Sequence, residues 1–337
     1  MEESFNMKKV CLLGGTGALG VYLTKELVKM GYQVDVVSMD DRTSVIKSLR
    51  YFQHDAKDLE FLKELLKNEY DAIVDFMIYP SIEEFSQYYP MFLENTSHYV
   101  YLSTYRVYGD TKDKVTEETP RILDLDLPDT FVKEWEYSIY KAQGEDALRA
   151  SGKRNWTILR PSITFSKRRF QLVTLEAPIV VHRMFEGKPI VLPKESLGSQ
   201  ATLSWGGDFG KMVSRLLFNP QAYGEAFTVG TAEHHTWKEM AEIYERIGGL
   251  KYVAVDADDF IELINGNVYS RQQLFYDRCF NRVIDNTKIL NATGMKQSDL
   301  MPTEVGLRLE LSRLDINTIP YHKEVYEKWD LFLNKHR

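Results

Sequence analysis

The chain has 337 residues, of which 44% are hydrophobic and 27% charged, and a formal net charge of −7. That length suffices for one large domain or for two smaller domains that share an interface. The acidic balance argues against a nucleic-acid or anionic-membrane partner. Cys11 and Cys279 give no disulfide framework, and no apolar run approaches the length of a membrane span. Because no signal-peptide pattern opens the chain, a soluble cytoplasmic protein is the simplest interpretation.

The first half of the chain alternates strand and helix patterns. The strand candidates are short and apolar throughout, which is typical of a parallel sheet covered on both faces. We therefore predict an α/β fold, a Rossmann-type doubly wound parallel sheet that binds ligands at the carboxyl ends of its strands. In chain order the expected strands are 9–13, 33–38, 50–54, 71–76, 99–103 and 156–159, and the expected helices are 21–30, 58–68, 82–94 and 133–150.

The regular alternation stops after Arg160-Pro161. A helix is expected over 208–218 and a strand over 226–229, which would return to the sheet. Thr236 and Glu239 form a capping box that opens a helix to Ile247, and a helix is expected near the C-terminus. We therefore predict two units: a dinucleotide-binding domain (1–165, with 205–232 returning to it) and a smaller, discontinuous C-terminal substrate-binding lobe (166–204 and 233–337).

A glycine-rich turn joins the first expected strand to the first expected helix. Glycines leave the backbone of such a turn open, so its amides and the helix N-terminus can face an anion such as a pyrophosphate. That position suits a dinucleotide, although a tight turn of this kind also needs glycine for structural reasons alone. The candidate cofactor-binding residues here are Gly14, Gly15, Thr16, Gly17, Ala18, Leu19 and Gly20.

Two further features carry chemistry. Tyr137 and Lys141 are four residues apart in a helical pattern, hence on one helix face, where an ammonium favours the phenolate form of the tyrosine. Tyr108 and Lys112 have the same spacing but enclose a turn sequence, so we do not expect a helix there. Thr104 ends an apolar strand, where its hydroxyl could orient a substrate oxygen or simply cap turn amides.

These elements, in this order, resemble the extended short-chain dehydrogenase/reductase superfamily, and within it the NAD-dependent epimerase/dehydratase family. The resemblance rests on Gly14-x-x-Gly17-x-x-Gly20, Asp55-Ala-Lys-Asp58, Leu102-Ser-Thr104, Tyr137-x-x-x-Lys141 and Leu159-Arg-Pro161. It implies Thr104, Tyr137 and Lys141 as catalytic residues, with Lys141 also binding the nicotinamide ribose. It further implies cofactor contacts near the adenine and the nicotinamide from Asp55, Asp58, Phe76, Pro161 and Ser162.

Departures from the family pattern narrow the expectations. Tyr105 and Arg106 stand where 4,6-dehydratases of the family have an Asp-Glu pair, so that elimination chemistry is disfavoured. At the end of the second strand, Ser38 with Arg42 could hold the 2′-phosphate of NADP, whereas Asp40 and Asp41 would oppose it. NAD is therefore slightly preferred over NADP.

The expected function is that of an NAD(P)-dependent oxidoreductase or epimerase acting on a sugar hydroxyl, with a nucleotide-sugar epimerase preferred. The alternatives are an NAD(P)H-dependent keto-sugar reductase and a non-catalytic family member that binds a dinucleotide or RNA. The expected partner is a small-molecule substrate, a nucleotide sugar, and a homodimer is a candidate assembly. His234-His235 has no third ligand at suitable spacing, so no metal site is expected. Two pairs of arginines could grip a substrate diphosphate or be ordinary surface charge: Arg168 with Arg169, and Arg278 with Arg282.

Overall fold

The computed structural model, which describes residues 7–126 and 137–335, is built on a seven-stranded sheet. All pairings in this sheet are parallel, in the order β11-β6-β5-β4-β1-β2-β3. This confirms the predicted doubly wound α/β fold. The strands are β1 (Lys9–Leu13), β2 (Gln33–Ser38), β3 (Leu49–Gln53), β4 (Ala72–Asp75), β5 (His98–Leu102), β6 (Trp156–Pro161) and β11 (Glu225–Val229).

Helices cover both faces of the sheet, and the alternation of side chains along β1 shows why its sequence is apolar throughout. Val10 and Leu12 belong to the core on one face, whereas Cys11 and Leu13 belong to the core on the other. The first face is covered by α1 (Gly20–Lys29), α8 (Gly206–Leu216) and α12 (Thr287–Thr293). The second face is covered by α2 (Leu59–Leu66), α3 (Ile82–Phe85), α4 (Tyr89–Asn95) and α6 (Tyr137–Ala150).

The single helix expected over 82–94 is wrong, because the chain forms α3 and α4 instead. Pro90 lies in the first turn of α4, where its missing N–H costs nothing. Inside a continuous helix the same proline would remove a hydrogen bond and clash with the preceding turn. For the helix expected over 133–150, residues 133–136 lie outside the described part of the chain.

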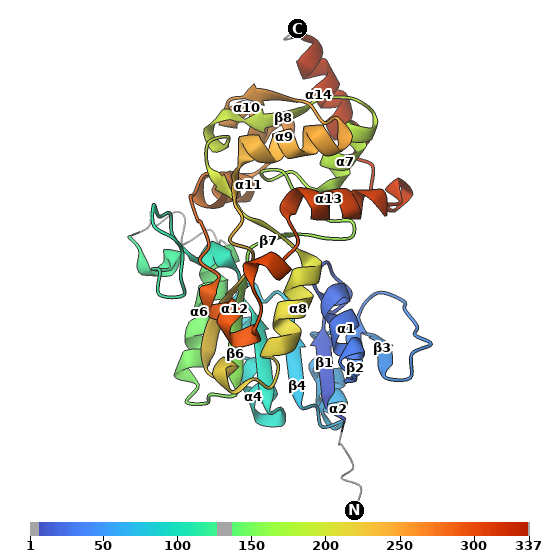
Figure 1. The fold of residues 1–337 in the computed structure, drawn as a ribbon, viewed down its shortest axis with the longest axis vertical. Coiled ribbons are helices and arrows are strands. Elements are labelled where there is room, and N and C mark those ends of the chain that lie inside the picture. Colours follow the sequence, from blue (N-terminus) through green and yellow to red (C-terminus); the bar gives the residue numbers. More distant parts are fainter. Residues whose placement is uncertain (1–6, 127–136, 336–337) are drawn as a thin grey trace, which may run out of the picture.

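The remaining segments build a second lobe above the sheet (Figure 1). Its core includes the indole rings of Trp237 and Trp329, which are both fully buried. Their ring nitrogens donate to Arg278 O (2.9 Å) and Leu263 O (2.9 Å). The elements are β7 (Ile163–Phe165), α7 (Ala177–Phe185), β8 (Ile190–Pro193), β9 (Gln200–Ala201), β10 (Leu203–Trp205), β12 (His235–Thr236), α9 (Trp237–Gly248), β13 (Tyr252–Val255), α10 (Ala257–Leu263), α11 (Val268–Gln273), α13 (Thr303–Ser312) and α14 (Lys323–Lys335).

The chain passes between the two lobes more than once. β11 joins the sheet beside β6, and α8 packs on α1. α12 also packs on the sheet side, with Ile289 and Leu290 in the same core as α1 and α8. Residues 287–293 therefore depart from the expected assignment of 233–337 to the substrate-binding lobe; the other expected domain limits stay a prediction. Within the described ranges, no helix has the length and apolar character needed to cross a membrane.

His98, at the start of β5, is fully buried and bonded on both ring nitrogens. Its Nε2 lies 2.8 Å from Thr157 Oγ1, and its Nδ1 accepts from the Phe218 amide at 3.1 Å. Because Thr157 Oγ1 donates to Ala222 O, the arrangement fits a neutral imidazole that donates through Nε2. Burial lowers the pKa of His98 to about 4.

This lowered pKa predicts acid destabilisation. The unfolded chain binds a proton at His98 near pH 6.5, but the folded protein does so only near pH 4. The free energy of unfolding should therefore fall by about 3 kcal/mol between pH 6.5 and 4 on account of this residue. Urea unfolding of the wild type and of His98→Gln at a series of pH values measures the difference. His234→Gln, at an exposed position, is the control. If the free energy of unfolding depends on pH in the same way in the wild type and in His98→Gln, the lowered pKa of His98 is contradicted.

Candidate active site

The glycine turn follows β1, at the position where the strand order reverses. Gly14 has φ +76°, a conformation that side chains other than glycine rarely adopt. A Cβ on Gly15 would lie 2.7 Å from Leu12 Cβ, and one on Gly20 would lie 2.4 Å from Gly15 O. The fold alone therefore requires glycine at these three positions.

Gly17 is different, because packing does not require its missing side chain. A Cβ there would meet no protein atom closer than Gly14 O, at 3.7 Å, and Gly17 lines a cavity of about 1020 Å³ together with Thr16 and Ala18. The helix that follows, α1, begins at Gly20; its N-cap residue, Leu19, makes no side-chain cap, and its first turn has no acidic residue. A bare backbone beside an uncapped helix N-terminus fits the diphosphate of a dinucleotide.

The residues expected at the adenosine end are largely engaged with one another. Thr16 Oγ1 and Ser38 Oγ lie 2.6 Å apart, and Ser38 Oγ also accepts from the Asp40 amide at 3.0 Å. Arg42 is paired with Asp40, with Nη2 3.3 Å from Oδ2. Arg42 lines the 1020 Å³ cavity, whereas Ser38 does not.

Asp55 and Asp58 have structural partners in the loop that opens α2. Asp58 Oδ1 accepts from the Glu60 and Phe61 amides as the N-cap of α2, and Oδ2 lies 2.9 Å from His54 Nε2. The hydrogen bond to His54, followed by that from Phe61, lowers the pKa of Asp58. Asp55 Oδ1 accepts from the Lys57 amide at 2.9 Å. Neither aspartate lines the cavities described here, so their contact with an adenine stays a prediction.

A second cavity, of about 460 Å³, brings the three predicted catalytic residues together. Thr104 follows β5, and Tyr137 and Lys141 lie in the first turns of α6. This cavity and the first one meet at the glycine turn, since Ala18 lines one and Leu19 the other, and Arg169 lines both. The predicted cofactor residues Phe76, Pro161 and Ser162 line the second cavity as well.

Lys141 is buried against backbone carbonyls and aromatic rings. Its Nζ donates to Leu102 O (2.7 Å) and Met77 O (3.3 Å) and lies 5.8 Å from the centre of the Tyr137 ring. Burial lowers the pKa of Lys141 to about 8, while the Asp75 carboxylate acts to raise it and the Lys57 ammonium to lower it. The ammonium is thus close enough to the phenol to favour its phenolate form.

Thr104 and Arg106 shape the other side of the second cavity. Thr104 Oγ1 accepts from the Arg106 amide at 3.2 Å and thereby caps η1 (Tyr105–Val107). Its hydroxyl hydrogen can still be donated to a ligand. The Arg106 guanidinium lies over the Tyr137 ring, 5.2 Å from its centre, and its Nε is 3.1 Å from an oxygen of buried Asp277. Arg106 thus places a cation, and no carboxylate, over the ring of Tyr137.

A buried ion pair between Glu145 and Arg160 stabilises the arrangement of this site, and it was not predicted from the sequence. Glu145 accepts from Arg160 Nε (2.9 Å) and Nη2 (2.6 Å) and from Ser103 Oγ (2.6 Å). Burial acts to raise the pKa of Glu145, but Arg160, Ser103 and Arg149 together outweigh burial and leave the pKa below its usual value. The spacing Tyr137, Lys141, Glu145 on one helix face was the available signal. Arg278 and Arg282 are likewise buried, both bonded to Asp277, and are not surface charge.

The seven-stranded parallel sheet and the glycine turn at its switch point define a Rossmann-type α/β fold. Residues 10–230 match the model of the NAD dependent epimerase/dehydratase family. The chain belongs to this family, which confirms the resemblance. In the described ranges, no group of three or more His, Cys, Asp or Glu side chains could hold a metal ion.

Two curated proteins are similar in sequence. The chain is 24% identical over 259 residues to the chloroplast stem-loop binding protein of 41 kDa b of Arabidopsis thaliana, covering 72% of this chain and 64% of that protein. It is 29% identical over 133 residues to the UDP-glucose 4-epimerase of Lactobacillus helveticus, covering 33% and 40%. The chain thus spans less than two thirds of the length of either relative.

Solved structures share the fold. An epimerase from Methanothermobacter thermautotrophicus superposes with a TM-score of 0.66 at 17% identity, covering 98% of this chain and 95% of that chain. The UDP-glucose 4-epimerase of Thermus thermophilus, solved with NAD, gives 0.64 at 20% identity, covering 90% and 98%. At these identities the comparison establishes the fold of both lobes.

The burial of Lys141 and the charges near it predict the pH at which its ammonium titrates. In the cofactor-free protein its ammonium should lose a proton near pH 8. Lys57→Met should raise this pKa by removing a nearby positive charge, and Asp75→Asn should lower it by removing a negative one. A pH titration of ¹⁵N-labelled lysine Nζ resonances measures all three proteins. Shifts of the same sign in both variants would contradict the assigned electrostatics.

Proposed function

We propose that this protein is an NAD-dependent epimerase that inverts a hydroxyl-bearing carbon of a nucleotide sugar. The observation that carries the proposal is that Thr104, Tyr137 and Lys141 line one cavity, which adjoins the glycine turn. A volume of about 460 Å³ suits a sugar-sized group. The UDP-sugar epimerases among the similar proteins support the substrate class.

The roles follow from the contacts of each side chain. Tyr137 removes the proton from the sugar hydroxyl, and Thr104 donates a hydrogen bond that orients the same oxygen. The Lys141 ammonium stabilises the phenolate of Tyr137 and is itself held by two backbone carbonyls. Reversible hydride transfer is the chemistry that a bound nicotinamide dinucleotide supplies. Inversion requires the keto-sugar to present its other face, after which Tyr137 returns the proton.

Two details of the site favour this reaction and NAD over their alternatives. Tyr105 and Arg106 provide no carboxylate pair, so the water elimination of a 4,6-dehydratase lacks its acid and base. At the adenosine end, Arg42 is paired with the carboxylate of Asp40 instead of being free for a 2′-phosphate, and that negative charge would oppose one. This supports NAD as the cofactor.

Substituting Tyr137 tests the proposal. Purified protein incubated with UDP-glucose or UDP-glucuronic acid, without added cofactor, should form the epimerised sugar. Tyr137→Phe should lower kcat by about 10²- to 10⁴-fold, because the proton then has no acceptor, while NADH binding persists. Tyr140→Phe, the same change on the same helix outside both cavities, should leave the rate near that of the wild type.

Three results would overturn the proposal. Unchanged epimerisation by Tyr137→Phe would remove the tyrosine from the reaction. Consumption of added NADPH with a keto-sugar, without any epimerised product, would favour the reductase alternative. Binding of a dinucleotide without turnover of either UDP-sugar would favour a non-catalytic family member.

A further inference from the structure

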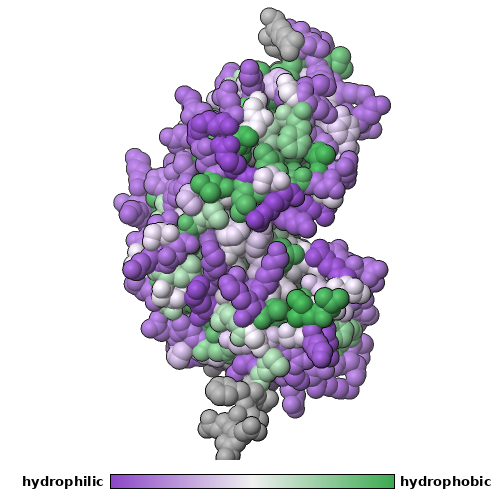
Figure 2. Space-filling model, turned by 45° about the vertical axis from the view of Figure 1, so that its right-hand side comes forward, coloured by the Kyte–Doolittle hydropathy of each residue, from purple (hydrophilic) through white to green (hydrophobic). Residues whose placement is uncertain are grey.

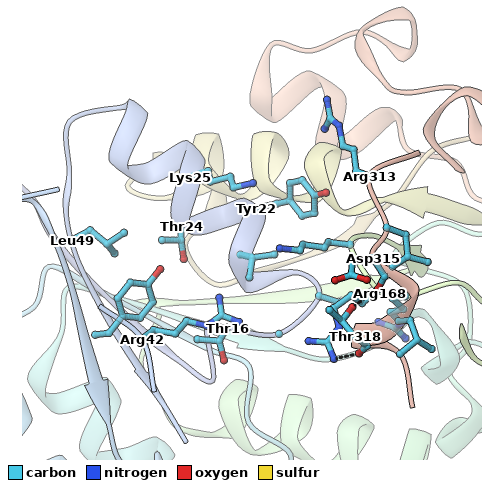
Figure 3. Close-up of a pocket in the computed structure, with 18 of the residues that line it drawn as sticks. Thr16, Tyr22, Thr24, Lys25, Arg42, Leu49, Arg168, Arg313, Asp315 and Thr318 are labelled. Carbon is cyan, nitrogen blue, oxygen red and sulfur yellow. Dashed lines mark hydrogen bonds between the residues drawn. The ribbon is translucent and has the colours of Figure 1, made fainter. Parts of the chain in front are cut away.

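The larger cavity is shared between the two lobes. On the side of the sheet it is lined by the glycine turn and the outer side of α1, and on the other side by 167–169, 313–315 and 318–320. Figure 2 shows a hollow in the surface between the lobes. In Figure 3, Thr16 and Arg42 lie on one side of the cavity, and Arg168, Arg313 and Thr318 lie on the other.

The lining of this cavity is strongly basic, in a chain whose net charge is −7. Within the described part of the chain, Asp315 is the one carboxylate among the lining residues, and Arg42 is paired with Asp40 outside the lining. Cations that face one cavity repel one another unless an anion lies between them. The remaining lining cations are Lys25, Lys29, Lys167, Arg168, Arg169 and Arg313.

Arg168 is held at the cavity wall in an unfavourable backbone conformation. Its φ is +69°, in the left-handed region that costs free energy for a residue with a side chain. Its Nη2 donates to Thr318 O at 2.6 Å, which ties the 167–169 segment to η7 (Ile316–Thr318). The neighbouring Arg169 donates to Thr164 Oγ1 at 3.3 Å and lies where the two cavities meet.

A partly buried contact at the wall of this cavity joins the two lobes. Tyr22 of α1 donates through its hydroxyl to Glu310 of α13, and Trp205 Nε1 donates to the same carboxylate oxygen at 2.6 Å. Burial, followed by the hydrogen bond to Glu310, raises the pKa of Tyr22, so the tyrosine stays a neutral donor. This contact holds the lobe that carries the arginines at a fixed separation from the glycine turn.

We propose that Arg168, Arg169 and Arg313 bind the diphosphate of the dinucleotide from the C-terminal lobe, opposite the backbone amides of the glycine turn. The inference rests on the proposed function, since it takes the dinucleotide as the ligand. Guanidinium groups match phosphate oxygens in geometry and charge. The diphosphate would then be bound by both lobes at once. Such a clamp would keep the cofactor bound throughout one catalytic cycle. The proposed epimerase needs this, because the hydride taken from the sugar must return to the same sugar.

Arg168→Gly and Arg313→Ala test the clamp. Glycine adopts φ +69° without strain, so Arg168→Gly removes the guanidinium without straining the backbone. NADH titrations followed by fluorescence should show dissociation constants raised about tenfold for each variant. Arg308→Ala is the matched control on α13, because Arg308 pairs with Glu304 and lines neither cavity. Its dissociation constant should equal that of the wild type.

Further ligands distinguish the source of the diphosphate. Like NADH, ADP should bind both arginine variants more weakly than the wild type, whereas UDP should bind the variants and the wild type equally well. If only the affinity for UDP falls in the variants, the arginines bind the substrate. If only the affinity for a stem-loop RNA falls, they bind nucleic acid. Either result overturns the clamp. Variants that bind NADH as well as the wild type overturn it while the proposed function stands. A wild-type protein that binds no dinucleotide overturns both.

Discussion

The site depends on one buried interaction, the pairing of Glu145 with Arg160. Glu145 lies two turns after Tyr137 on α6, Arg160 lies on β6, and the same carboxylate accepts from Ser103 at the end of β5. Both charges are almost completely buried, so removing either partner would leave the other without compensation, at a cost of about 3–5 kcal/mol. The bidentate geometry fixes the helix against two strands.

That attachment determines where the reactive groups lie. Ser103 is fixed by Glu145, so the adjacent Thr104 is presented at the mouth of the second cavity, and the first turns of α6 bring Tyr137 and Lys141 to the same cavity. Lys141 in turn bonds to carbonyls of residues after β4 and at the end of β5. The sheet edge, the helix and the glycine turn therefore form one rigid frame around the two cavities.

Much of this was predictable from sequence, and the exceptions have physical reasons. Short apolar runs located the strands, and the Thr236 capping box located the start of α9, because both signals are local. The break between α3 and α4 was missed because the apolar period continues through Pro90. The role of Asp58 as the N-cap of α2 could be predicted locally, whereas its contact with an adenine stays a prediction. Arg168 and Thr318 are 150 residues apart, so no local pattern could predict their contact.

The central claim, that a hydride leaves the sugar carbon and returns to the same carbon within one binding event, can be tested directly by isotope retention. A UDP-sugar deuterated at the reacting carbon is incubated with the protein in ordinary water, with unlabelled NADH present in solution. The account predicts that the epimerised product keeps its deuterium at that carbon. Loss of the label to water, or its replacement by hydrogen from the added NADH, would contradict it.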